Sequence, residues 1–107
     1  MEFNKLVRDK IPEIISNSGK TPIIRILDDA EYVSFLEKKL DEEVAEYHES
    51  KEIEELADVL EVVYALCNAQ GHSVEELMDI YQKKHEERGG FSEKILLIRN
   101  EEKHEKI

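Results

Sequence analysis

The sequence predicts an all-α protein, an antiparallel bundle of about four helices, and two observations carry that prediction. Apolar residues recur with the period of an α-helix through residues 29–49 and again through residues 52–70. A capping box from Ser73 to Glu76 then opens a further helix, which should end at Arg88–Gly90. A short first helix is expected as well, with Pro12 in its first turn.

Two segments depart from this helical pattern. Residues 22–27 and 94–99 are rich in isoleucine and leucine and resemble β-strands. Because a strand is not stable alone, we expect the two to pair as a small β element that joins the ends of the fold. Residues 100–107 form a charged tail that should fray.

Length and charge limit the class of protein. The 107 residues suit a single domain over 1–107, and the formal net charge of -11 disfavours nucleic acid as a partner. An anionic small molecule is still possible if a divalent cation lies between it and the protein. The single Cys67, the lack of a signal-peptide core and the lack of a long apolar run favour a cytoplasmic protein with no membrane span.

A chain reversal is expected near Ser50, although no glycine or proline marks a break there. In one continuous helix, the apolar stripes around Glu43 and Glu55 would point about 120° apart at ~100° per residue. Two stripes with different directions suit two helices that fold against each other. Ser50 is then the expected turn residue or N-cap.

Two pairs of carboxylates lie on these helices with i, i+3 spacing, which places each pair on one helix face. Glu43 and Glu55 fall inside the apolar stripes, and Glu46 and Asp58 lie at the stripe edges. Acids that face one another in a core repel and need compensation. Oxygen-only ligands favour Mg²⁺, with Mn²⁺ as the second choice. The alternative is a solvated helix edge, because 26 acids in 107 residues make chance pairs common.

A magnesium site of this kind points to phosphate chemistry and should have basic partners. Lys84 and Arg88 share a helix face ahead of two glycines, and Arg8 and Lys10 form a second basic group. We consider all four as phosphate-binding candidates. The alternative for Lys84 and Arg88 is surface charge that suits a helix C-terminus.

Four stretches together resemble the all-α nucleoside triphosphate pyrophosphohydrolases, and in particular their small MazG-like, phosphoribosyl-ATP pyrophosphohydrolase-like members. KLDEEVAE and EELADVLEVVYAL are similar to the E-x-x-E … E-x-x-D signature of that superfamily. NKLVRDKIPEII and the K-x-x-x-R-G-G-F run from Lys84 to Phe91 are similar to the small members. The resemblance covers most of the chain, from Asn4 to about Ile98.

The resemblance implies Mg²⁺-dependent hydrolysis of a nucleoside triphosphate to the monophosphate and pyrophosphate, as in house-cleaning of the nucleotide pool. It makes Glu43, Glu46, Glu55 and Asp58 the metal ligands, with Glu43 or Glu46 assisting the attacking water. Lys84 and Arg88 match a motif position to which we assign phosphate contact. Proteins of this type assemble as homodimers or tetramers with the site near an interface.

Two other functions stay open at this point. One is hydrolysis of phosphoribosyl-ATP in histidine biosynthesis, which activity on that compound alone would favour. The other is a non-catalytic helical oligomerisation or regulatory module, which would bind Mg²⁺ without releasing phosphate or pyrophosphate from any nucleotide.

Overall fold

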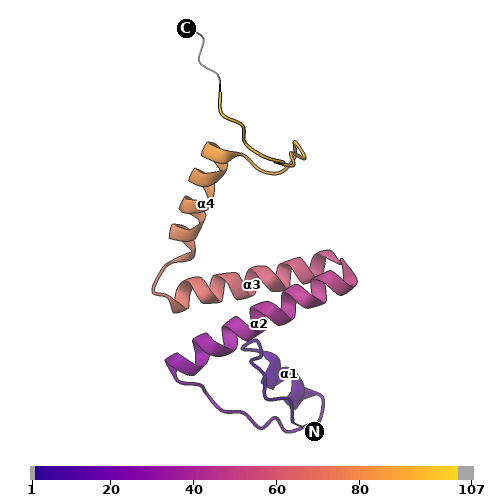
Figure 1. Cartoon of the computed structure of the whole chain (residues 1–107). Helices are drawn as coiled ribbons and strands as arrows, with labels where there is room; N and C mark the ends of the chain where they lie inside the picture. The colour runs from indigo at the N-terminus through magenta and orange to yellow at the C-terminus, as the bar shows by residue number, and fades with distance from the viewer. Residues whose placement is uncertain (1, 104–107) are drawn as a thin grey trace.

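The computed structural model describes residues 2–103 and confirms the all-α class. Its four helices are α1 (Ile11–Asn17), α2 (Asp29–Ser50), α3 (Ile53–Ala69) and α4 (Val74–Arg88) (Figure 1). The positions agree with the sequence pattern to within a residue or two at each end. None of these helices combines the length and apolar character that a membrane span requires.

Helices α2 and α3 form an antiparallel hairpin and lie side by side along their length (Figure 1). The chain reverses at Lys51, whose backbone is left-handed with φ 60°. Ser50 closes the turn because its Oγ accepts a hydrogen bond from Glu52 N at 3.2 Å. The predicted reversal near Ser50 is therefore confirmed, but the N-cap of α3 is Glu52.

Lys51 gives a test of this turn. A left-handed conformation costs a residue with a Cβ about 1–2 kcal/mol, and glycine avoids that strain at some cost in unfolded-chain entropy. We expect Lys51→Gly to raise the free energy of unfolding by roughly 0.5–1 kcal/mol in urea denaturation. Lys51→Ala is the matched control, because it removes the charge and keeps the strain. Equal stabilities of the two variants would contradict this account of the turn.

The core of the chain is small and lies between α2 and α3. Only Leu36, Val62 and Leu66 are buried apolar side chains among the described residues. Leu6 packs against them from the segment before α1, so the N-terminal segment is attached to the hairpin. Within residues 2–103 the hairpin is thus the one part with a packed interior, and it carries the predicted acids.

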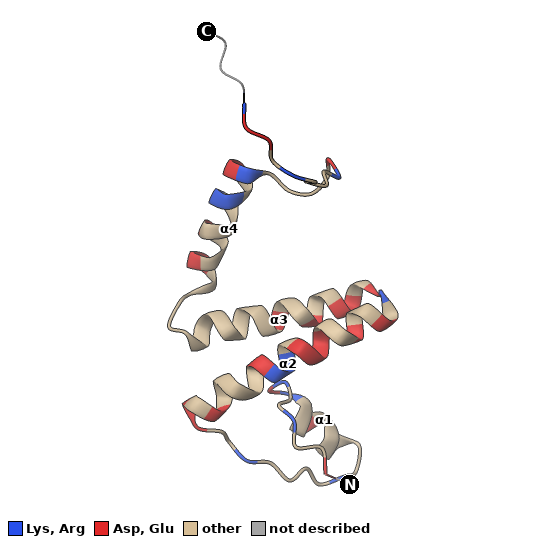
Figure 2. Ribbon diagram, in the orientation of Figure 1, with Lys and Arg blue, Asp and Glu red and all other residues tan. Residues whose placement is uncertain are grey.

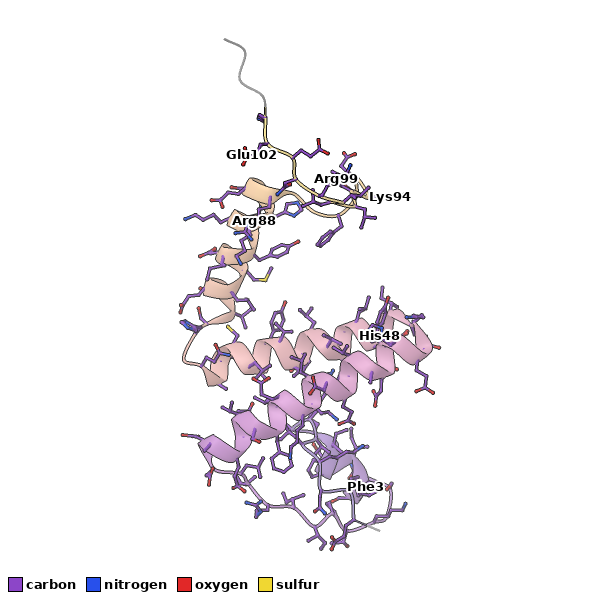
Figure 3. The ribbon with its side chains drawn as sticks, in the orientation of Figure 1. Phe3, His48, Arg88, Lys94, Arg99 and Glu102 are labelled. Carbon is purple, nitrogen blue, oxygen red and sulfur yellow. The ribbon has the colours of Figure 1, made fainter. Side chains whose placement is uncertain are left out.

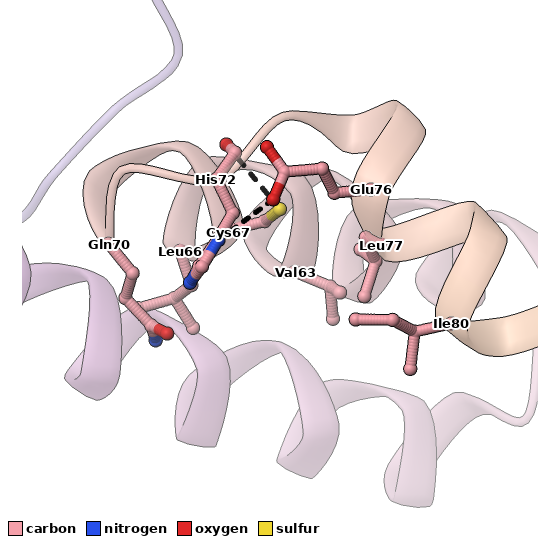
Figure 4. Close-up of a pocket in the computed structure, with 8 residues that line it drawn as sticks. All are labelled: Val63, Leu66, Cys67, Gln70, His72, Glu76, Leu77 and Ile80. Carbon is pink, nitrogen blue, oxygen red and sulfur yellow. Dashed lines mark hydrogen bonds and ion pairs between the residues drawn. The ribbon is translucent and has the colours of Figure 1, made fainter.

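A well-defined corner joins α3 to α4. Gly71 takes φ 85°, and the capping box predicted from Ser73 to Glu76 is present, with Ser73 Oγ accepting from Glu76 N at 3.1 Å. His72 Nδ1 lies 3.1 Å from a Glu76 carboxylate oxygen, and Cys67 Sγ donates to Ser73 O at 3.2 Å. These contacts surround an apolar pocket of about 270 Å³ between the two helices (Figure 4).

This corner points α4 away from the hairpin, so the described residues do not close into one compact bundle (Figure 1). The longest dimension is 79 Å and the radius of gyration is 20.3 Å. A compact domain of this length would have a radius of gyration of about 13 Å. Of the four described helices, only α2 and α3 pack against each other along their length.

The β element predicted within the chain is not observed, because residues 2–103 contain no strand. Residues 22–27 and 94–99 lie at opposite ends of the molecule, with the α2–α3 hairpin between them (Figure 1). The α3–α4 corner is the physical reason, since it carries the second segment away from the first. Of the tail, residues 100–103 are exposed without regular structure, and residues 104–107 lie outside the described part.

Candidate metal centre

The hairpin brings the predicted carboxylates together. Glu43 of α2 faces Glu55 and Asp58 of α3, and one carboxylate oxygen from each lies within 4.8 Å of the others. Glu42 and Glu46 form a second such group with Glu43. We call these five residues the acidic cluster. Figure 2 shows this concentration of acids where α2 and α3 run side by side.

Glu43 is the buried member of the acidic cluster, with 7% of its surface exposed. One oxygen, Oε1, lies 3.3 Å from Lys39 Nζ, whereas Oε2 is buried and has no hydrogen-bond partner. Burial raises the pKa of Glu43, and the neighbouring Glu46 raises it further, while Lys39 acts in the opposite direction. The position predicted to point into the core therefore does so.

Glu55 and Asp58 complete the cluster from α3 and are half-buried. Loss of hydration raises the pKa of Glu55, and the charges of Asp58 and Glu43 add to that effect. Asp58 Oδ1 accepts a hydrogen bond from Arg8 Nη2 at 2.7 Å, although the two residues are 50 positions apart in sequence. This bond attaches the segment before α1 to the cluster.

Two cations balance part of the cluster's charge, Lys39 from α2 and Arg8 from the N-terminal segment. Neither Lys39 nor Glu42 was predicted from the sequence as part of the site, and Lys39 Nζ lies 3.5 Å from Glu42 Oε1. The i, i+4 spacing of Lys39 and Glu43 is the signal that would have identified the lysine. Five ionised carboxylates with two cations leave three negative charges unbalanced.

The donor set fits a hard divalent cation. All its atoms are carboxylate oxygens, which suit Mg²⁺ or Mn²⁺ better than softer metals. Glu43 Oε2 is the clearest sign, since a buried carboxylate oxygen without a partner is destabilising. A divalent ion would supply that partner and neutralise the excess charge.

The four predicted phosphate-binding residues do not all lie at this site. Arg8 contacts the acidic cluster through Asp58. None of Lys10, Lys84 and Arg88 forms an ion pair with a carboxylate in the described part of the chain. Lys84 and Arg88 lie on α4, and Figure 3 shows Arg88 at the end of that helix, beyond the α3–α4 corner from the hairpin.

Part of this chain is similar to part of one curated protein. A curated, uncharacterised protein of Mycolicibacterium smegmatis (strain ATCC 700084 / mc(2)155) is 64% identical over 42 residues, which are 39% of this chain and 43% of that protein. The chain therefore spans less than half of the length of this relative. No family model and no solved structure matches the chain. Support for a function comes from the acidic cluster itself.

Proposed function

We propose that this chain is a small MazG-like member of the all-α nucleoside triphosphate pyrophosphohydrolases. It would hydrolyse a nucleoside triphosphate to the monophosphate and pyrophosphate with Mg²⁺, as a house-cleaning enzyme of the nucleotide pool. One observation carries the proposal: two i, i+3 acid pairs on paired helices converge around Glu43, which has a buried, unpartnered oxygen. Solvated surface acids have no reason to leave a carboxylate oxygen in that state.

The metal ligands in this proposal are Glu43, Glu46, Glu55 and Asp58. A bound Mg²⁺ would supply Lewis-acid polarisation of the phosphate oxygens and would offset their charge. Arg8 already holds one oxygen of Asp58, which fixes the orientation of that carboxylate. Lys39 does the same for Glu43 Oε1 and leaves Oε2 available.

The remaining roles fall to the residues of the chain. Glu43 or Glu46 accepts the proton of the attacking water. The water oxygen bonds to the phosphorus nearest the nucleoside as the bond to the pyrophosphate oxygen breaks. Arg8, Lys10, Lys84 and Arg88 offset the charge on the departing pyrophosphate.

A second copy of the chain is the other partner in this proposal. The described chain has three buried apolar side chains, while many of its large apolar residues are exposed. Such a surface is typical of a subunit that buries area in an assembly. A homodimer or tetramer would also bring α4 of one copy to the hairpin of another, which would close the helices into an antiparallel bundle between copies.

A panel of nucleotides tests the function. The full-length protein is incubated with canonical and modified triphosphates and with phosphoribosyl-ATP, in Mg²⁺ and in EDTA, and all phosphorus products are identified. We expect monophosphate and pyrophosphate in equal amounts with Mg²⁺ and neither with EDTA. Stepwise release of single phosphates, or no product from any compound, would contradict the proposal. Hydrolysis of phosphoribosyl-ATP alone would move the assignment to histidine biosynthesis.

A further inference from the structure

We infer that residues 23–28 of one copy pair with residues 94–99 of a second copy as an antiparallel β element, and that the exchange is reciprocal. The inference rests on the self-association proposed above and is independent of the hydrolytic reaction. It identifies which surfaces meet and in which register. A two-fold axis would create two such elements in each dimer.

Residues 23–27 and 95–99 lack regular structure and are open to a partner, whereas Lys94 has a left-handed backbone (φ 59°) and donates its N–H to Phe91 O at 3.1 Å, so pairing must extend the backbone at Lys94. No backbone hydrogen bond joins residues 21–27 or 95–99 to any other described residue. Their apolar side chains are mostly exposed, with Ile23 at 92% and Ile95 at 84%. A run of strand-forming residues with free N–H and C=O groups is a template for pairing with another chain.

The α3–α4 corner decides between pairing within one chain and pairing between two. Within one chain, residues 94–99 would have to return past the hairpin, and the corner would have to open. That movement would break the Cys67–Ser73 contact and separate Leu77 of α4 from α3. A second copy can accept the segment with the corner intact.

Charge selects residues 23–28 as the partner segment. If residues 94–99 paired antiparallel with their own copy in register, Lys94 would lie opposite Arg99, which is unfavourable. Pairing with residues 23–28 can instead place Lys94 opposite Asp28. Figure 3 shows Lys94 and Arg99 at the free end of the molecule, beyond α4.

This register also sorts the side chains onto two faces. With Asp28 opposite Lys94, Ile26 lies opposite Leu96 and Ile24 lies opposite Ile98, since antiparallel partners advance in opposite directions. One face of the element is then apolar and ends in an ion pair. The other face carries both arginines together with Ile23, Leu27, Ile95 and Leu97, and Arg25 is already held by Glu31 at 2.9 Å and 3.1 Å.

Disulfide trapping tests both the exchange and its register. In a Cys67→Ser background, one tagged chain carries Ile26→Cys and a second, differently tagged chain carries Leu96→Cys. We expect oxidation of the mixture to give a covalent dimer of the two different chains. The control replaces Ile26→Cys by Arg25→Cys, whose side chain lies on the other face and should cross-link poorly.

The double variant Ile26→Cys/Leu96→Cys in one chain separates the two topologies. Exchange predicts a covalent dimer on non-reducing gels, and pairing within the chain predicts an oxidised monomer. An oxidised monomer, or no cross-link in any combination, would overturn the inference. Pyrophosphate release is measured separately on the wild type, which carries no introduced cysteine. Failure of the cross-link and failure of the proposed reaction are therefore distinguishable.

Discussion

Replacing Glu43 with glutamine should abolish Mg²⁺-dependent pyrophosphate release and, at the same time, make the metal-free protein more stable. Glutamine removes a buried charge that faces other acids, and its amide can donate to the oxygens of Glu46 or Glu55. We expect the free energy of unfolding to rise by about 1–3 kcal/mol in EDTA. Activity should fall roughly a thousand-fold or more, because metal stabilisation of the transition state is worth several kcal/mol.

The stability gain should depend on pH with a definite sign. The pKa of Glu43 is raised in the folded state by burial, so the folded protein holds this proton more tightly than the unfolded chain does. The wild type therefore loses stability relative to Glu43→Gln as pH rises through the unfolded pKa. The difference becomes constant above the folded pKa. Urea denaturation in EDTA across the acidic range measures it.

Glu49→Gln is the matched control for this prediction. Glu49 lies on the same helix, is exposed, and lies outside the acidic cluster. That variant should keep the activity and the pH dependence of the wild type. If Glu43→Gln released pyrophosphate at the wild-type rate, the cluster would not be the catalytic metal centre. If Glu43→Gln were less stable than the wild type in EDTA, the charge-repulsion account of Glu43 would fail.

The second large effect concerns the basic face of α4. We expect Lys84→Ala with Arg88→Ala to lower kcat/KM by roughly 10²–10³-fold, because two charge-assisted contacts to the phosphates are lost. Fold stability should change little, since both side chains are exposed on a helix end. Steady-state pyrophosphate release and thermal unfolding measure the two quantities on one preparation. Lys83→Ala is the control on the same helix.

Mixing variants shows which copy supplies these residues. Within one chain, α4 lies beyond the corner from the acidic cluster, so its basic residues would act on the site of a second copy. A mixture of Glu43→Gln with the Lys84→Ala/Arg88→Ala chain should then recover activity after subunit exchange. No recovery, with exchange verified by differently tagged chains, would mean that each site uses its own α4 or none.

The helices and the acidic cluster could be predicted because their signals are local. The i, i+3 pairs, the Ser73 capping box and the apolar stripes each depend on residues within a turn or two. The ion pair between Arg8 and Asp58 could not be predicted from local spacing, because the two residues are 50 positions apart in sequence. Lys39 was within reach at i, i+4 from Glu43 and was overlooked.

The predicted β element is not observed in the described residues, because strand-forming residues show that a strand is favoured and do not show where its partner lies. Two similar segments in one chain suggested that they meet. The direction of α4 depends on Gly71 and on the contacts of Cys67 and His72, which no periodicity reveals. The sequence likewise predicted that Lys84 and Arg88 share one face of α4. Their distance from the acidic cluster depends on the α3–α4 corner and could not be predicted.

The acidic cluster is tested most directly by Mn²⁺ binding, measured as loss of the free-ion signal in electron paramagnetic resonance. We expect the wild type to bind Mn²⁺, Mg²⁺ to compete for the site, and Glu49→Gln to bind like the wild type. Glu43→Gln and Asp58→Asn should lose the bound ion. Equal Mn²⁺ binding by the wild type and Glu43→Gln would contradict the claim that the α2–α3 hairpin holds a divalent cation.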